Sequence, residues 1–306
     1  MSKVLVTGGA GFIGSHVVDL LIEKGYKVVV VDDLSSGYAK NLNRKARFCK
    51  VDIRDQKKLR DVFRKEQPQF VVHAAAQVQV VRSVNDPAED ASINVIGGIN
   101  VLECCKAYKV KKFVYMCTGG ALYGEPNYLP ADEEHLIMPI APYGASKHCI
   151  EHYCYLYNYN FGLDYVVLRF SNVYGPRDDP KSGRLIPNFV GAMLSKKRPF
   201  ITGDGTQGRD FIYVLDVARA VVKALEKRTK SRYFNIGTEK VISVNDIYSI
   251  TESILKTGIR PKYVAKRPGE VQQIYLKASL AYKELGWKAS VGIVEGLKAY
   301  IEWVFA

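Results

Sequence analysis

The first half of the chain alternates between short apolar runs and longer segments whose apolar residues recur at helical spacing. The runs KVLVT, KVVVV and DYVVLRF are rich in consecutive Val, Leu and aromatic residues, so they predict strands that are buried on both faces. Such strands occur in parallel sheets whose two faces are covered by helices. The pattern therefore predicts a doubly wound α/β sheet with right-handed crossovers.

The strands are expected at residues 3–7, 27–31, 47–51, 69–75, 111–116 and 164–170, and the helices at 11–24, 55–65, 87–108 and 143–161. After residue 171 the pattern loosens into segments rich in Pro and Gly, such as YGPRDDPKSGR and GDGTQGRD. Loops of this composition commonly carry ligand contacts. We therefore expect a main domain over residues 1–171 and a smaller, mixed α/β substrate lobe over residues 172–306. Some of the chain of this lobe is expected to return to the main domain.

The net charge of +13 raises the question of nucleic-acid binding. The basic residues are spread over separate stretches such as NRKARFCK and SKKR, and aromatic residues do not alternate with them as in single-strand binding surfaces. We therefore expect no nucleic-acid partner, and interpret the charge as a solvated basic surface that suits ligands bearing phosphate.

The six cysteines are scattered and form no CxxC pair, which argues against a disulfide framework and a structural zinc site. No apolar run is long enough to cross a bilayer, and the first residues predict a strand rather than a cleavable leader. These features predict a cytoplasmic protein without a membrane partner.

The segment VTGGAGFIG places Gly8, Gly11 and Gly14 between a strand and a helix. This arrangement is typical of a Rossmann-type dinucleotide site, in which the glycines allow a tight turn, a close approach to the pyrophosphate and helix packing. Asp32 ends the second strand, where a carboxylate accepts hydrogen bonds from ribose hydroxyls and repels a 2′-phosphate. The motif predicts NAD as the cofactor, in preference to NADP.

The segment YGASK places Tyr143 and Lys147 four residues apart at the start of a predicted helix, so both point the same way. A free Tyr ionises near pH 10. A nearby ammonium and the positive nicotinamide ring would favour the phenolate and make Tyr143 a usable base. Thr118 ends the preceding strand and supplies a hydroxyl beside this pair.

His148 and His152 lie four residues apart on the same predicted helix, at a spacing that some metal ligands share. No third ligand accompanies them, so we expect no metal site.

The predicted helices at 87–108 and 143–161 are apolar on more than one side. On each helix, one apolar face must cover the sheet, and the other apolar face needs another partner. A homodimer formed through a helical bundle is the favoured interpretation, and burial under the C-terminal lobe is the alternative.

These motifs, together with LRFSNVYGPR and the later segments GDGTQGRDFIYVLDVA, NIGTEKVISV and RPGEVQQIYLKASLAYKELGW, extend over essentially the whole chain. In this order they resemble the extended short-chain dehydrogenase/reductase superfamily and, within it, the UDP-glucose 4-epimerase family. The resemblance implies that cofactor-binding residues are Gly8, Gly11, Phe12, Ile13, Gly14, Asp32, Asp33, Leu34, Ser35, Ser36, Gly37, Asp52, Ile53, Ala74, Ala75, Ala76, Gln77, Asn94, Tyr143, Lys147 and Phe170. It implies that substrate-binding residues are Thr118, Asn172, Arg184, Leu185, Thr202, Arg209, Arg267, Glu270 and Ile274.

The resemblance also implies a mechanism in which Tyr143 takes the proton of the sugar 4-hydroxyl while hydride passes from C4 to NAD. The 4-keto sugar then turns over and is reduced on its other face. Many family members have a Ser at the position of Gly119, so we assign the missing hydroxyl to Thr118. Related dehydratases carry an acid just after this hydroxyl, whereas this chain has Gly119 and Gly120, which favours epimerisation.

Ile274 is expected beside the C2 substituent of the sugar, where its intermediate size favours UDP-glucose and UDP-galactose over N-acetylated sugars. Epimerisation of another UDP-sugar, an N-acetylated hexosamine or glucuronate, is the alternative. A protein on the same fold that only senses NAD is a further alternative, although such a protein would not need Thr118, Tyr143 and Lys147 together.

Overall fold

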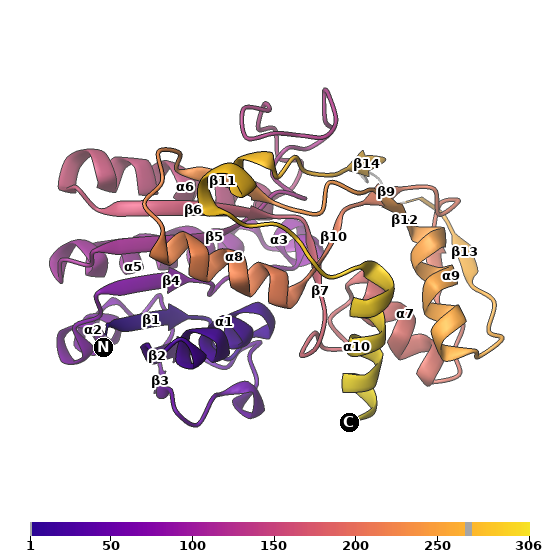
Figure 1. Cartoon of the computed structure of the whole chain (residues 1–306), viewed down its shortest axis with the longest axis horizontal. Helices are drawn as coiled ribbons and strands as arrows, with labels where there is room; N and C mark the ends of the chain where they lie inside the picture. Colours follow the sequence, from indigo (N-terminus) through magenta and orange to yellow (C-terminus); the bar gives the residue numbers. More distant parts are fainter. Residues whose placement is uncertain (1, 267–270) are drawn as a thin grey trace.

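The computed structural model describes residues 2–266 and 271–306. Its centre is a seven-stranded sheet in the order β11-β6-β5-β4-β1-β2-β3, and every neighbouring pair is parallel (Figure 1). The strands are β1 (Lys3–Thr7), β2 (Lys27–Asp32), β3 (Arg47–Lys50), β4 (Phe70–His73), β5 (Lys112–Thr118), β6 (Asp164–Phe170) and β11 (Tyr233–Ile236). The predicted doubly wound parallel sheet is therefore confirmed.

Two hydrophobic cores lie on opposite faces of this sheet because successive side chains of a strand point to opposite sides. On one face, Val4 and Val6 of β1 pack with α1 (Phe12–Glu23) and α8 (Val214–Glu226). On the other face, Leu5 packs with α2 (Gln56–Glu66), α5 (Gly97–Ala107) and α6 (Pro142–Phe161). Figure 1 shows α1 and α8 on the near side of the sheet.

The strand order reverses at β1, which has β4 on one side and β2 on the other. In open α/β sheets, the crevice at the carboxyl ends of the strands at such a reversal is the usual ligand site. The loops after β1, β2 and β4, which contain the predicted cofactor residues, all open at this edge.

The remaining chain builds the second lobe, on the right in Figure 1. Its helices are α7 (Leu185–Leu194), α9 (Val244–Leu255) and α10 (Ile293–Phe305). Small sheets join β7 (Asn172–Tyr174) to β10 (Phe211–Tyr213), β8 (Phe200–Thr202) to β13 (Lys262–Val264), and β9 (Gly208–Arg209) to β12 (Ile242–Ser243) and β14 (Gln273–Ile274). Because β11 and α8 belong to the main sheet, the chain passes between the lobes more than once. The boundary after residue 171 stays a prediction.

Two features of the segment after β4 differ from the expected pattern. A short helix, α3 (Val80–Asn85), precedes the predicted helix at 87–108, which is itself divided into α4 (Pro87–Ala91), a π-helical turn (Ser92–Ile96) and α5. At the start of α5, a Cβ on Gly97 would lie 2.5 Å from Ile53, and a Cβ on Gly98 would lie 2.7 Å from Ile150. The glycines therefore let this helix approach its neighbours closely, as the periodicity of the sequence alone does not reveal.

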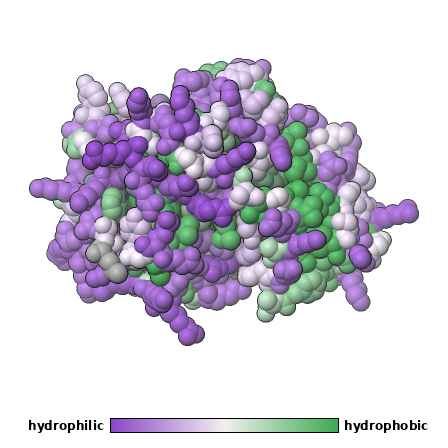
Figure 2. Space-filling model, viewed as in Figure 1, coloured by the Kyte–Doolittle hydropathy of each residue, from purple (hydrophilic) through white to green (hydrophobic). Residues whose placement is uncertain are grey.

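The face drawn in Figure 2 is largely hydrophilic, with a hydrophobic area on the second lobe. Among the described residues, no helix is long and apolar enough to span a membrane.

Candidate active site

The glycine-rich turn joins β1 to the amino end of α1. Gly8 has a φ of 70°, and a Cβ there would lie 2.6 Å from the backbone nitrogen of Ala75, so both conformation and space require glycine. A Cβ on Gly14 would lie 2.1 Å from the carbonyl oxygen of Gly8, because α1 starts directly against the turn. Gly11, the N-cap of α1, makes no side-chain cap. The helix therefore presents backbone N–H groups that suit a pyrophosphate.

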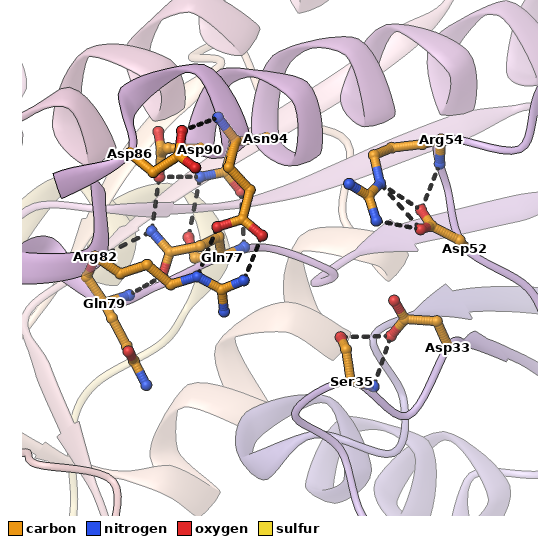
Figure 3. Close-up of polar contacts among 11 residues, drawn as sticks. Asp33, Ser35, Asp52, Arg54, Gln77, Gln79, Arg82, Asp86, Asp90 and Asn94 are labelled. Carbon is orange, nitrogen blue, oxygen red and sulfur yellow. Dashed lines mark hydrogen bonds and ion pairs between the residues drawn. The ribbon is translucent and has the colours of Figure 1, made fainter. Parts of the chain in front are cut away.

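Asp32 ends β2 beside this turn and is 7% exposed. Its carboxylate accepts hydrogen bonds from the backbone nitrogens of Ala10 (3.0 Å) and Leu34 (2.9 Å). Burial raises the pKa of Asp32, and these two hydrogen bonds oppose the rise. The carboxylate thus connects the glycine turn to the predicted ribose-binding loop, in which Asp33 accepts hydrogen bonds from Ser35 (Figure 3).

Asp52, one of the predicted cofactor-binding residues, lies beyond β3. Arg54 donates to both of its carboxylate oxygens at 2.6–3.1 Å, as Figure 3 shows, and this hydrogen bonding lowers the pKa of Asp52. Sequence reasoning did not identify Arg54, because a single basic residue in a loop carries no distinguishing pattern. Ile53 is held from the other side, since Asn100 donates to its carbonyl oxygen at 3.1 Å.

The loop after β4, which includes the predicted residues 74–77, is fixed by side chains at its back. The hydroxyl of Thr7 pairs with Nδ1 of His73 at 2.7 Å and accepts a hydrogen bond from the nitrogen of Ala75 at 3.2 Å. Burial lowers the pKa of His73 to about 3, and the charge of Lys147 acts in the same direction. His73 is therefore neutral. This hydrogen-bonded pair holds β1 and β4 together where the cofactor is expected.

Thr118, Tyr143 and Lys147 come together at the carboxyl end of β5. The side chains of Thr118 and Tyr143 lie close enough for Thr118 to lower the pKa of Tyr143, and Oγ1 of Thr118 accepts a hydrogen bond from the nitrogen of Ala121 at 3.2 Å. Lys147 follows one turn along α6, is 3% exposed, and places Nζ 4.4 Å from the ring centroid of Tyr115. The structure thus brings all three predicted catalytic residues to one place.

The pKa of Tyr143 reflects its buried position. Burial raises it, the negative charge of Asp90 adds to this, and Arg184 and the side chain of Thr118 oppose it. The positive charge of a bound nicotinamide ring would favour the phenolate. That Lys147 and this ring together make Tyr143 a usable base stays a prediction.

Cys117 precedes Thr118 on β5 and therefore points to the opposite face of the sheet. It is buried in the core beneath α6, and burial raises its pKa well above the ordinary value. Glu151 of α6 is paired with Arg169 at 2.8 Å. Cys117 is thus a neutral thiol within the core, whereas Thr118 lies at the edge of the sheet.

A cavity of about 370 Å³ lies in the second lobe, and Val80 of α3 contributes to its lining from the main domain. It is lined by the predicted substrate residues Asn172, Arg184, Leu185, Thr202 and Arg209. The guanidinium of Arg184 also lies 5.3 Å from the ring centroid of Phe12, so it reaches the glycine turn. The cavity therefore combines cationic, amide and hydroxyl groups suited to a nucleoside diphosphate.

Ile274, another predicted substrate residue, does not line this cavity. Ile274 is 3% exposed and packs in a hydrophobic cluster with Leu122, Tyr123 and Leu276. Arg267 and Glu270 lie outside the described residues. The place of these three residues at the substrate stays a prediction.

His148 and His152 lie side by side on α6, with their Nε2 atoms 3.1 Å apart. Nδ1 of His148 pairs with Glu151, whose carboxylate is already engaged by Arg169. Within residues 2–266 and 271–306, no group of three potential ligands could hold a metal ion.

Comparison with known proteins identifies the family. The NAD dependent epimerase/dehydratase family matches residues 4–237. The chain belongs to this family. The putative UDP-glucose 4-epimerase of Methanocaldococcus jannaschii is 47% identical over 304 residues, which cover 98% of this chain and 98% of that protein.

Two solved structures of relatives are also similar over nearly their whole length. The UDP-glucose 4-epimerase of Thermotoga maritima with UDP-glucose has a TM-score of 0.97 and 44% identity, covering 99% of this chain and 98% of the other. The UDP-N-acetylglucosamine 4-epimerase of Methanobrevibacter ruminantium in complex with UDP-N-acetylmuramic acid has a TM-score of 0.93 and 34% identity, with the same coverage. Family members of this shape therefore differ in the sugar that they are named for.

In this chain, steric contacts explain why position 119 is a glycine. A Cβ on Gly119 would lie 2.5 Å from Cδ1 of Leu276 and 3.4 Å from the carbonyl oxygen of Arg169. A serine there would require Leu276 to move. A Cβ on Gly120 would meet only Oδ1 of Asn172, at 3.5 Å. The space at position 119 is thus filled from the second lobe, which leaves Thr118 as the hydroxyl next to Tyr143.

Proposed function

We propose that this chain is an NAD-dependent 4-epimerase that interconverts UDP-glucose and UDP-galactose. The observation that carries the proposal is the meeting of Thr118 and Tyr143, with Lys147 one turn away, near the cavity that is lined by Arg184 and Arg209. The family membership and the names of the relatives support the same chemistry.

The residues of the chain fit the cofactor. Gly8 and Gly14 are required by the turn, Gly11 leaves the amino end of α1 uncapped, and buried Asp32 carries the negative charge that disfavours a 2′-phosphate. When bound, NAD accepts hydride from C4 of the sugar and returns it. The residues expected to hold NAD are those around these three loops, together with Tyr143 and Lys147.

Tyr143 serves as the base that takes the proton from the sugar 4-hydroxyl and later returns it. Thr118, next to Tyr143, orients and polarises the 4-oxygen. Arg184, Arg209 and Asn172 hold the diphosphate, so the substrate is gripped mainly through its nucleotide. A weak grip on the sugar lets the keto intermediate turn over before it is reduced.

A dehydratase would need a further acid or base close to Thr118. The next residues along the chain are Gly119, Gly120 and Ala121, none of which can transfer a proton. This supports simple epimerisation, which requires no proton-transfer group beyond Tyr143.

We further propose a homodimer, formed through the outer faces of α5 and α6. Leu156, Tyr159 and Phe161 of α6 are 44%, 76% and 55% exposed, and large apolar side chains on one helix favour a protein partner.

All six cysteines are free, which supports a reducing cytoplasm as the place of action. We propose galactose metabolism as the corresponding pathway.

The proposal is tested by incubating the purified protein with UDP-glucose, UDP-galactose, their N-acetylated counterparts and UDP-glucuronate, and separating the 4-epimers by chromatography. Tyr143→Phe is the matched control, because it should abolish turnover and leave binding of NAD and UDP nearly unchanged. Absence of any 4-epimer, or turnover by the variant equal to that of the unmodified protein, would contradict the proposal.

A further inference from the structure

Asp90 is a buried acid next to the predicted catalytic residues that the proposed mechanism does not use. It lies on α4, which packs against α6, and it is 1% exposed. Its Oδ1 accepts hydrogen bonds from Nε2 of Gln77 (2.8 Å) and Nδ2 of Asn94 (3.0 Å). Its Oδ2 is buried without a hydrogen-bond partner among the described residues.

The side chain of Asn94 is also bound to the backbone of Gln77. The backbone nitrogen of Gln77 donates to Oδ1 of Asn94 at 2.9 Å, and Nδ2 of Asn94 donates to the carbonyl oxygen of Gln77 at 3.0 Å. Figure 3 shows Asp90 and Asn94 on one helical segment, both directed at Gln77. The π-helical turn at Ser92–Ile96 contains Asn94, and such turns are frequent at functional sites. Asp90 therefore fixes the loop after β4, in which cofactor residues are predicted.

The unpartnered oxygen matters because of the charges around Lys147. Burial lowers the pKa of Lys147, whereas Cys117 and Glu151, followed by Asp90 and Cys154, act to raise it. Burial keeps both thiols protonated by raising their pKa values well above the ordinary range, so neither contributes charge near neutral pH. This leaves Glu151 and Asp90 as the acids that face Lys147.

These two acids differ in their partners. Glu151 is paired with Arg169, through hydrogen bonds of 2.8 and 2.9 Å, so its charge is largely balanced. Within the described part of the chain, no ion pair closer than 4 Å includes Asp90 or Lys147. The remaining groups facing Lys147 are the neutral His73 and the rings of Tyr115 and Tyr143.

We infer that Asp90 is a positioning residue of the epimerase reaction, which fixes Gln77 and Asn94 with one oxygen and balances the ammonium of Lys147 with the other. This inference rests on the proposed function for its kinetic test. The Asp90 carboxylate acts across the contact between α4 and α6, and touches neither Tyr143 nor Lys147 through a hydrogen bond. Its charge also reaches Tyr143, which is faced in addition by Thr118, Cys117 and Arg184.

If the charge of Asp90 matters, its removal should shift the pH dependence of activity, which the loss of a purely structural contact would not do. Removing a negative charge favours the deprotonated forms of both Tyr143 and Lys147, so both titrate at lower pH. In a bell-shaped profile the acidic limb requires ionised Tyr143 and the alkaline limb requires protonated Lys147. Both limbs of the pH profile are therefore expected to move to lower pH, by about one pH unit for the loss of one nearby buried charge.

The experiment compares Asp90→Asn with Asp86→Asn in the NAD-loaded protein. An asparagine at position 90 keeps an oxygen for Gln77 and Asn94 and loses only the charge. Asp86 caps the same helix by accepting from the nitrogen of Glu89 at 2.9 Å, and its exposed charge faces solvent. Asparagine is an equally good N-cap, so Asp86→Asn removes one acid from the same helix and should leave the profile in place.

We expect both limbs of the pH profile to move to lower pH in Asp90→Asn and to stay in place in Asp86→Asn. The inference would be overturned if the profile of Asp90→Asn coincided with that of the unmodified protein, or if the variant lost activity equally at every pH. Asp90→Ser, which leaves space for a water molecule, serves as a second charge-free variant if Asp90→Asn does not fold.

A second measurement separates this inference from the proposed function. The absorbance change on ionisation of Tyr143 is obtained as the difference between each protein and its Tyr143→Phe counterpart, which requires no turnover. Tyr143 should ionise about one pH unit lower in Asp90→Asn. An unshifted titration refutes the role of Asp90 even if the enzyme is active, and a shifted titration supports it even if no UDP-sugar is epimerised.

Discussion

The substitution Gly119→Ser tests why the chain lacks the serine that many of its relatives carry. The new Cβ would lie 2.5 Å from Cδ1 of Leu276, a distance that real Cβ atoms essentially never show, and Leu276 is fully buried. The serine can enter only if Leu276 shifts within a close-packed cluster. Inserting atoms into such a core typically costs about 1–3 kcal/mol of unfolding free energy.

Denaturant unfolding followed by tryptophan fluorescence measures this cost. Gly120→Ser is the matched control, because its Cβ would make only an ordinary contact of 3.5 Å with Asn172 and should leave the free energy of unfolding nearly unchanged. Leu276→Ala alone should cost about 2–5 kcal/mol through the cavity it creates. The double variant Gly119→Ser/Leu276→Ala should cost less than the sum of the two, since each change relieves the other. Equal stability of Gly119→Ser and Gly120→Ser, or strictly additive costs in the double variant, would refute the steric explanation.

Three further predictions concern the site. Thr118→Ala should lower turnover by about ten- to a thousandfold, as expected for the loss of one positioned hydrogen-bond donor, and a larger loss in Cys117→Ala would show that the hydroxyl was assigned wrongly. Asp32→Ala should weaken NAD binding and reduce the preference over NADP, measured by titration of both cofactors, whereas equal binding of both by the unmodified protein would disprove the assignment. Comparing Ile274→Tyr with Ile274→Ala on UDP-glucose and UDP-N-acetylglucosamine tests whether Ile274 adjoins the C2 substituent, since a pocket wall discriminates between substrates by about 1–3 kcal/mol. If neither variant changes the ratio of activities on the two substrates, Ile274 lies elsewhere.

The strands of the main sheet could be predicted because burial on both faces leaves nearly continuous apolar runs, and the observed ends of β1 and β6 coincide with the expected ones. Helix α3 and the π-helical turn could not. The segment of α3, VVRSVN, is rich in β-branched residues, and its conformation depends on the preceding loop, where Gln77 and Gln79 bond to each other. Such structure is decided by contacts that no local pattern encodes.

The same distinction applies to the candidate site. The spacing of Tyr143 and Lys147 and the strand-end position of Thr118 are local, so the sequence predicts that they meet. Asp90 acts through its buried partners Gln77 and Asn94, and Arg54 pairs with Asp52 two residues away. As single charged residues, both look in the sequence like any solvated acid or base. Burial, which opposes ionisation of Tyr143, depends on the packed structure and could not be predicted from the sequence.

The return of α8 and β11 to the main sheet bears on how the chain folds as it leaves the ribosome. Strand β6 is completed at one edge by β11, and one face of the sheet, including Val114 and Leu168, is covered by α8. The first 171 residues therefore emerge with an apolar face and an open strand edge, both of which promote aggregation in unfinished chains. The nascent chain cannot complete its dinucleotide-binding sheet until Ile236 has been synthesised, by which time nearly half of residues 172–306 has also been synthesised.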